Sequence, residues 1–133
     1  MNLRRDVVIL ACAVSGGIHG ALAPAHFADG VPAGVGFAAS AAVLALLAVL
    51  LTLRPAGAPA LAGAATVLAG LLASYALATT TGVPLLQPQV EPVDGLALVT
   101  KAIEAAGLVA ALSLLRRRPA AAFSLIQPKG TLT

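Results

Sequence analysis

Long apolar stretches alternate with short polar segments along the whole chain. Each stretch covers about 20 residues, which is the length that a helix needs to cross the hydrocarbon core of a bilayer. No alternation of polar and apolar residues suggests membrane-spanning strands. The pattern therefore predicts an all-α fold, an integral membrane four-helix bundle within residues 1–118, followed by a short tail at 119–133. The four predicted helices cover residues 7–23, 33–53, 60–78 and 96–115.

Helix-breaking residues lie between these stretches. Pro24, Asp29, Gly30 and Pro32 predict a loop between the first two, and residues 54–59 predict a tight turn between the second and third. The segment 82–95 contains three prolines and predicts a longer, extended connection before the last helix.

The first helix is predicted to remain part of the mature chain. A basic start, an apolar run and Ala21-Leu22-Ala23 together resemble a signal peptide. Pro24 directly follows the apparent cleavage site and disfavours cleavage.

Composition narrows the class of protein. The 133 residues are 59% hydrophobic and 10% charged, whereas a soluble domain is roughly 45–50% apolar and about 25% charged. These values argue against a soluble enzyme, a disordered protein or a nucleic-acid-binding domain. No phosphate-binding loop or zinc-protease motif is present, and the five serines lie mostly in apolar runs, so the chain is not expected to be an enzyme. The single cysteine, Cys12, excludes an internal disulfide framework.

Charges predict the orientation in the membrane. Arg4 and Arg5, Arg54, and residues 116–118 fall on one side of a four-span protein, whereas Asp29, Glu91 and Asp94 fall on the other. The positive-inside rule then places both termini in the cytoplasm. The abundance of Ala, Leu, Val and Gly is typical of a bacterial protein encoded in a GC-rich genome. We therefore expect a multi-pass protein of the bacterial inner (plasma) membrane.

Two histidines form the first polar group at the outer side. His19 and His26 are seven residues apart and share a helix face if the helix continues past Pro24, with Asp29 following. On a straight helix they lie about 10.5 Å apart along the axis, which is wide for one metal ion. A bend at Pro24 would bring them closer. The alternative is that His19 packs against a neighbouring helix while His26 faces water.

Lys101 and Glu104 form a charged pair within the last predicted helix. They are three residues apart and so are neighbours on one helix face. Because an unpaired charge in a membrane is costly, the two side chains are expected to neutralise each other. The pair is either a structural salt bridge, part of a proton or cation path, or the source of a carboxylate ligand facing the histidines.

Hydroxyl groups form the third polar group at the outer end of the third predicted helix. Tyr75 and Thr79 are four residues apart, and both are expected to line a pocket in the bundle, whereas Thr80 and Thr81 follow at the helix end. Alternatively, the hydroxyls only cap the helix. Carboxylates of the long connection, Glu91 and Asp94, are expected to close over this pocket.

Small residues four apart predict close helix packing. Gly16 and Gly20 lie beside His19 in the first helix, and Gly107 and Ala111 form a similar pair in the last helix.

The segment Ile18-His19-Gly20-Ala21-Leu22-Ala23-Pro24-Ala25-His26-Phe27, with residues 91–96 and Val99-Thr100-Lys101, resembles small, uncharacterised membrane proteins of actinobacteria. This resemblance covers about a third of the chain and implies no activity. The size and topology also resemble small multidrug resistance transporters. That family carries its essential Glu in the first helix and is rich in Trp and Tyr, which this chain does not match.

These features lead to three hypotheses for function. The first is a binding protein whose outward-facing pocket holds a metal ion, such as copper or zinc, or another small ligand. Haem fits less well, because aromatic residues to line it are scarce. The second is an accessory or structural subunit of a larger membrane complex, and the third is a small oligomeric transporter or channel that uses Lys101 and Glu104. The bilayer is the expected partner in all three, a homo-oligomer is an alternative, and no nucleic acid is expected. The candidate metal ligands are His19, His26, Glu104, Asp29, Glu91 and Asp94.

Overall fold

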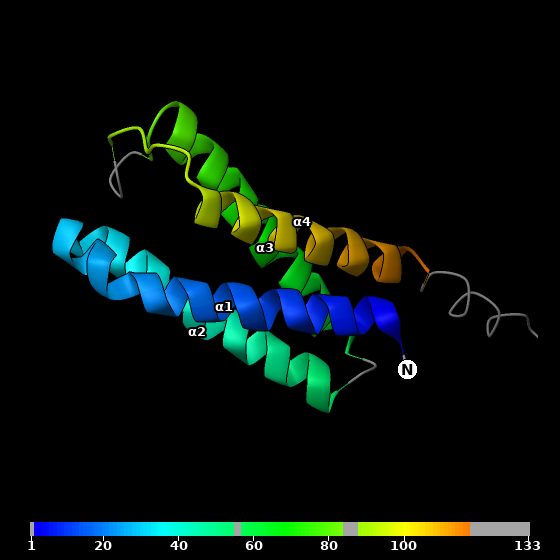
Figure 1. Cartoon of the computed structure of the whole chain (residues 1–133). Helices are drawn as coiled ribbons and strands as arrows, with labels where there is room; N and C mark the ends of the chain where they lie inside the picture. The colour runs from blue at the N-terminus through cyan, green and yellow to red at the C-terminus, as the bar shows by residue number, and fades with distance from the viewer. Residues whose placement is uncertain (1, 55–56, 84–87, 118–133) are drawn as a thin grey trace, which may run out of the picture.

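Four helices in antiparallel succession make up the computed structural model of this protein (Figure 1), which describes residues 2–54, 57–83 and 88–117. The helices are α1 (Leu3–Asp29), α2 (Val31–Leu53), α3 (Ala58–Thr80) and α4 (Gly95–Arg116). Each is long and apolar enough to cross a membrane. For the described residues, the prediction of an all-α fold with four helices able to span a membrane is confirmed. The predicted tail, residues 119–133, lies outside the described residues.

The structure replaces the loop expected after Pro24 with a single residue. Helix α1 continues through Pro24 to Asp29, and only Gly30 separates it from α2. The Gly30 N–H donates to the His26 carbonyl at 3.0 Å, and the Gly30 carbonyl accepts from the Gly34 N–H at 3.1 Å. Pro32 lies in the first turn of α2, where a missing N–H costs no helical hydrogen bond. The turn is this tight because Gly34 has no Cβ, which would collide with the Phe27 ring.

The connection between α3 and α4 begins and ends at recognisable residues. Gly82 adopts a positive φ of 73°, the left-handed conformation with which helices commonly terminate. Asp94 caps the other side, because its carboxylate accepts from the Ala97 N–H at 2.8 Å. The Glu91 N–H donates to the Ala78 carbonyl at 2.9 Å and ties the connection back to α3.

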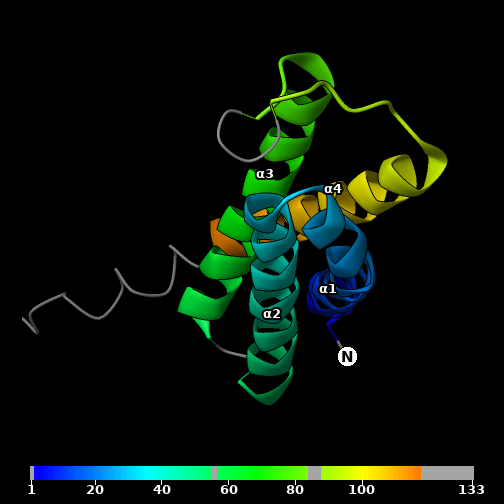
Figure 2. The ribbon, with the colours of Figure 1, turned by 90° about the vertical axis from the view of Figure 1, so that its left-hand side faces the viewer.

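The apolar core fills one half of the bundle. Its buried residues come from the start of α1, the end of α2, the start of α3 and the end of α4, and they include Val8, Cys12, Leu44, Leu51, Leu68 and Ala111. Helix α1 packs mainly on α2 and α4, and α3 packs mainly on α4. The helix pairs diverge toward the opposite end, where the connection bridges the separated ends of α3 and α4 (Figures 1 and 2). We call this opposite end the open end.

Helices α1 and α4 approach each other closely at Gly107. A Cβ added at Gly107 would collide with the Cβ of Ala11 and press against Leu68. Gly16 allows a similar approach of α1 to α2, where its added Cβ would lie 3.1 Å from the Cβ of Leu44. The predicted role of Gly16 and Gly107 in close packing is therefore confirmed.

Candidate functional site

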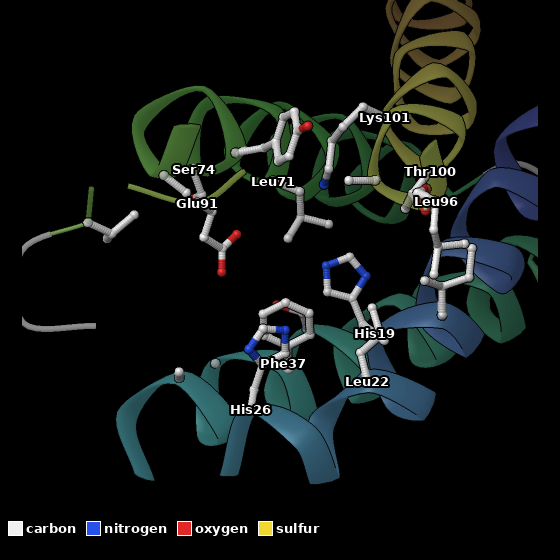
Figure 3. Close-up of a pocket in the computed structure, with 18 of the residues that line it drawn as sticks. His19, Leu22, His26, Phe37, Leu71, Ser74, Glu91, Leu96, Thr100 and Lys101 are labelled. Atoms are coloured by element: carbon white, nitrogen blue, oxygen red, sulfur yellow. Dashed lines mark hydrogen bonds between the residues drawn. The ribbon is translucent and has the colours of Figure 1, made fainter. Parts of the chain in front are cut away.

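A cavity of about 500 Å³ occupies the open end of the bundle. All four helices and the α3–α4 connection contribute to its wall (Figure 3). Much of the lining is apolar, including Ile18, Leu22, Phe37 and Leu71. The polar side chains in the lining are His19, His26, Ser40, Ser74, Tyr75, Glu91, Asp94, Thr100 and Lys101.

A buried charge network separates this cavity from the apolar core. Glu104 lies near the middle of α4 and is 0% exposed. Its Oε1 accepts from the Ser15 hydroxyl at 2.6 Å, and its Oε2 accepts from the Lys101 ammonium at 2.6 Å. The expected pairing of Lys101 with Glu104 is thus present, and Ser15 adds a link from α4 to α1. Both carboxylate oxygens are satisfied inside the protein, as a buried charge requires.

His19 lies next to this network, and one of its ring nitrogens forms a hydrogen bond to the backbone. Its Nδ1 lies 2.9 Å from the Ser15 carbonyl oxygen. Because a carbonyl only accepts hydrogen bonds, Nδ1 carries the hydrogen, and Nε2 of the neutral ring is left with a lone pair. The residue is 7% exposed, and Nε2 makes no hydrogen bond with any residue that the structure describes. Figure 3 shows the ring projecting into the cavity.

Phe37 of α2 contacts both histidines of α1. Its ring centroid lies 5.2 Å from that of His19 and 3.7 Å from that of His26, with the second pair stacked. The histidines therefore share one helix face, as their spacing predicts for a helix that continues through Pro24. His26 Nδ1 is 3.7 Å from Asp29 Oδ2 and has no hydrogen-bond partner among the described residues.

Glu91 carries a carboxylate that faces the cavity. Its side chain is half-buried and points into the cavity in Figure 3. The Glu91 carboxylate forms no hydrogen bond or ion pair with any other residue in the described ranges. Asp94 also lines the cavity, but its carboxylate caps α4.

Tyr75 and Thr79 differ in their roles. Tyr75 lines the cavity, its ring centroid lies 5.5 Å from the Lys101 ammonium, and its buried hydroxyl has no partner within the described chain. The Thr79 hydroxyl instead donates to the Tyr75 carbonyl at 3.0 Å, and Thr79 is absent from the cavity lining. Thr80 and Thr81 likewise bond to carbonyls of α3, which matches the capping alternative.

The six candidate metal ligands do not form one cluster. His19, His26, Glu91 and Asp94 line the cavity, whereas Glu104 lies behind Lys101 and Asp29 is exposed at the outer edge. Among the residues that the structure describes, no three His, Cys, Asp or Glu side chains lie close enough together to hold a metal ion.

Sequence reasoning missed two residues of the site. Ser15 looks like an ordinary member of an apolar run, although its spacing of four from His19 places it on the same helix face. Phe37 carries no signal in the sequence, because its contact with both histidines depends on how α1 and α2 pack.

Comparison of the chain with models of protein families, with curated proteins and with solved structures gives no significant match.

Proposed function

We propose that this chain is a small integral membrane protein that binds a small amphipathic organic ligand in the cavity at its open end. The observation that carries the proposal is the buried His19 ring, whose Nε2 faces the cavity without a hydrogen-bond partner among the described residues. This atom is not among the buried, unpartnered polar atoms of the described chain, so it is reachable from the cavity and can accept a hydrogen bond from a ligand or water there.

The size and lining of the cavity support this proposal. A volume of about 500 Å³ falls within the range of roughly 300–1,000 Å³ that is typical of small-molecule sites. Such sites combine apolar walls with a few polar groups that orient the ligand, and this cavity has Phe37, Leu22 and Leu71 beside His19 and Glu91. No contact among the described residues favours the subunit or transporter alternatives over binding.

The arginines support an orientation with the cavity facing outward. Figure 1 places the start of α1 and the end of α4 at the same end of the bundle, opposite the open end. Arg4, Arg5, Arg54, Arg116 and Arg117 belong to helix ends on that side. The positive-inside rule assigns this side to the cytoplasm, and we propose the plasma membrane of a bacterial cell as the location.

Obstructing the cavity is expected to abolish binding of a neutral amphipathic probe. Ala78 of α3 is 9% exposed and lines the cavity, so Ala78→Trp places an indole where the ligand would lie. The probe is 2-phenylethanol, and saturation-transfer NMR on protein in non-ionic detergent measures its contact with the protein. Wild type is expected to transfer saturation to the phenyl protons, and Ala78→Trp to lose this signal.

The matched control is Ala73→Trp, which adds the same side chain at an exposed position of α3 outside the cavity. It corrects for probe dissolved in the micelle and is expected to behave like wild type. Equal saturation transfer to the probe in wild type, Ala78→Trp and Ala73→Trp would overturn the proposal.

A copper or zinc ion is a second candidate ligand, and one observation favours it. Metal-binding histidines commonly donate their other ring N–H to a backbone carbonyl, as His19 does to Ser15. If an ion binds, protein incubated with copper or zinc and then desalted is expected to retain about one equivalent by elemental analysis. The double variant His19→Ala, His26→Ala is expected to retain none. Equal metal content in wild type and the double variant would exclude a histidine-held ion.

A further inference from the structure

We infer that the ligand is a protonated organic amine with an apolar or aromatic body, held by the Glu91 carboxylate and by an N–H donated to His19 Nε2. This inference rests on the proposed binding function and names the chemical class of its ligand.

The charges at the open end favour a cation. Of the described residues, Asp29, Glu91 and Asp94 place three carboxylates there, and no arginine lies among the cavity-lining residues. Glu91 is the carboxylate that points into the cavity without an ion-pair partner in the described chain. A cationic ligand would neutralise Glu91, which in a partly desolvated site is favourable.

Lys101 does not make the cavity attractive to an anion. Its ammonium lies 2.6 Å from Glu104 Oε2, and that carboxylate is 0% exposed. The pair is neutral as a whole, so an anion entering the cavity would meet the uncompensated charge of Glu91. Repulsion between two like charges is strong in a site of low dielectric, so it disfavours binding of an anion beside Glu91.

The free hydrogen-bonding atom of His19 distinguishes an amine from a quaternary ammonium ion. Nδ1 donates to the Ser15 carbonyl, so Nε2 of the neutral ring can only accept. A protonated amine has N–H groups for both Nε2 and Glu91, whereas a quaternary ammonium has none.

The aromatic side chains fit the body of such a ligand. Phe37 and the two histidines form a continuous wall of rings, and the Tyr75 ring lies on α3. Ring faces attract organic cations and also contact apolar groups. A bare metal ion would leave this wall without a partner.

Three probes with the same phenyl body test the inference. They are 2-phenylethylammonium, its N-trimethyl derivative and the anion 3-phenylpropanoate, each titrated at neutral pH into the full-length protein in non-ionic detergent. The ammonium is expected to bind at least about tenfold more tightly than the anion, because one charge–charge contact in a partly buried site exceeds that energy. The trimethyl derivative is expected to bind with intermediate affinity.

Two variants separate the contributions of charge and hydrogen bonding. Glu91→Gln keeps the shape and is expected to weaken both cations about tenfold, whereas Asp6→Asn, the same kind of change at the far end of α1, leaves them unchanged. His19→Phe keeps a ring and removes the acceptor. It is expected to weaken the ammonium and spare the trimethyl derivative, whose binding also reports that the variant is folded.

The outcomes distinguish this inference from the binding function itself. Tighter binding of the ammonium that depends on Glu91 and His19 supports the inference. An anion that binds as well as the ammonium, a Glu91→Gln variant with wild-type affinities, or binding of none of the three probes overturns it. In those cases, the 2-phenylethanol measurement still decides separately whether the cavity binds small molecules.

Discussion

Replacement of Glu104 by alanine is expected to lower the free energy of unfolding by about 3–5 kcal/mol, the cost of removing one partner from a buried ion pair. The Lys101 side chain is only 15% exposed and would lose its counter-ion. The fully buried Ser15 hydroxyl would lose its acceptor on α4. Reversible unfolding in mixed micelles of sodium dodecyl sulfate and a mild detergent, followed by circular dichroism, measures the loss.

Two further variants test the cause of this loss. Lys101→Ala, Glu104→Ala removes both charges and is expected to recover part of the stability, because no uncompensated ion remains. Glu91→Ala removes a carboxylate that has no ion pair in the described chain and is expected to leave unfolding unchanged. A double variant no more stable than Glu104→Ala would contradict the ion-pair explanation.

Replacement of Gly107 by alanine is expected to destabilise the bundle by about 1–3 kcal/mol through overpacking. Alanine is the better helix former by about 1 kcal/mol, so propensity alone predicts the opposite sign. The added Cβ would collide with Ala11 Cβ and lie 3.1 Å from Leu68 Cδ1, and all three residues are buried. The same micellar unfolding measurement applies.

A control and a rescue accompany this variant. An added Cβ at Gly70 of α3 has no neighbour within 4 Å, so Gly70→Ala is expected to leave stability unchanged or to raise it slightly. The double variant Ala11→Gly, Gly107→Ala exchanges the glycine and the alanine between α4 and α1. It is expected to recover most of the lost stability, because only one Cβ then lies at the contact. If Gly107→Ala stabilises the protein, α1 and α4 do not approach as closely as described.

The helices and the charged pair could be predicted because each depends on local sequence. Apolar runs long enough to span a membrane predict α1 to α4, and the spacing of three between Lys101 and Glu104 predicts their contact on one helix. The extent of α1 could not be predicted in the same way. In soluble proteins, a proline in the interior of a helix usually kinks or ends that helix. Helix α1 nevertheless continues through Pro24, where it packs along α2.

The site depended on contacts between helices that no spacing encodes. The bond from Ser15 to Glu104 joins residues 89 positions apart, and the contacts of Phe37 depend on the tight turn at Gly30. The sequence also places Tyr75 and Thr79 together, although the Thr79 hydroxyl bonds to its own helix. In a membrane, where threonine readily donates to a carbonyl one turn earlier, a shared face does not imply a shared pocket.

The hydrogen bonds of the buried network also bear on how the chain is assembled. The His19 bond to Ser15 lies within α1, and the Lys101 bond to Glu104 lies within α4. In the proposed membrane protein, these two bonds can therefore form within each helix as it inserts, even though α1 is synthesised long before α4. The Ser15–Glu104 bond is the exception, because it requires both helices side by side. It forms only when α1 and α4 associate, and it then fixes their register at a buried position where no water competes for the bond.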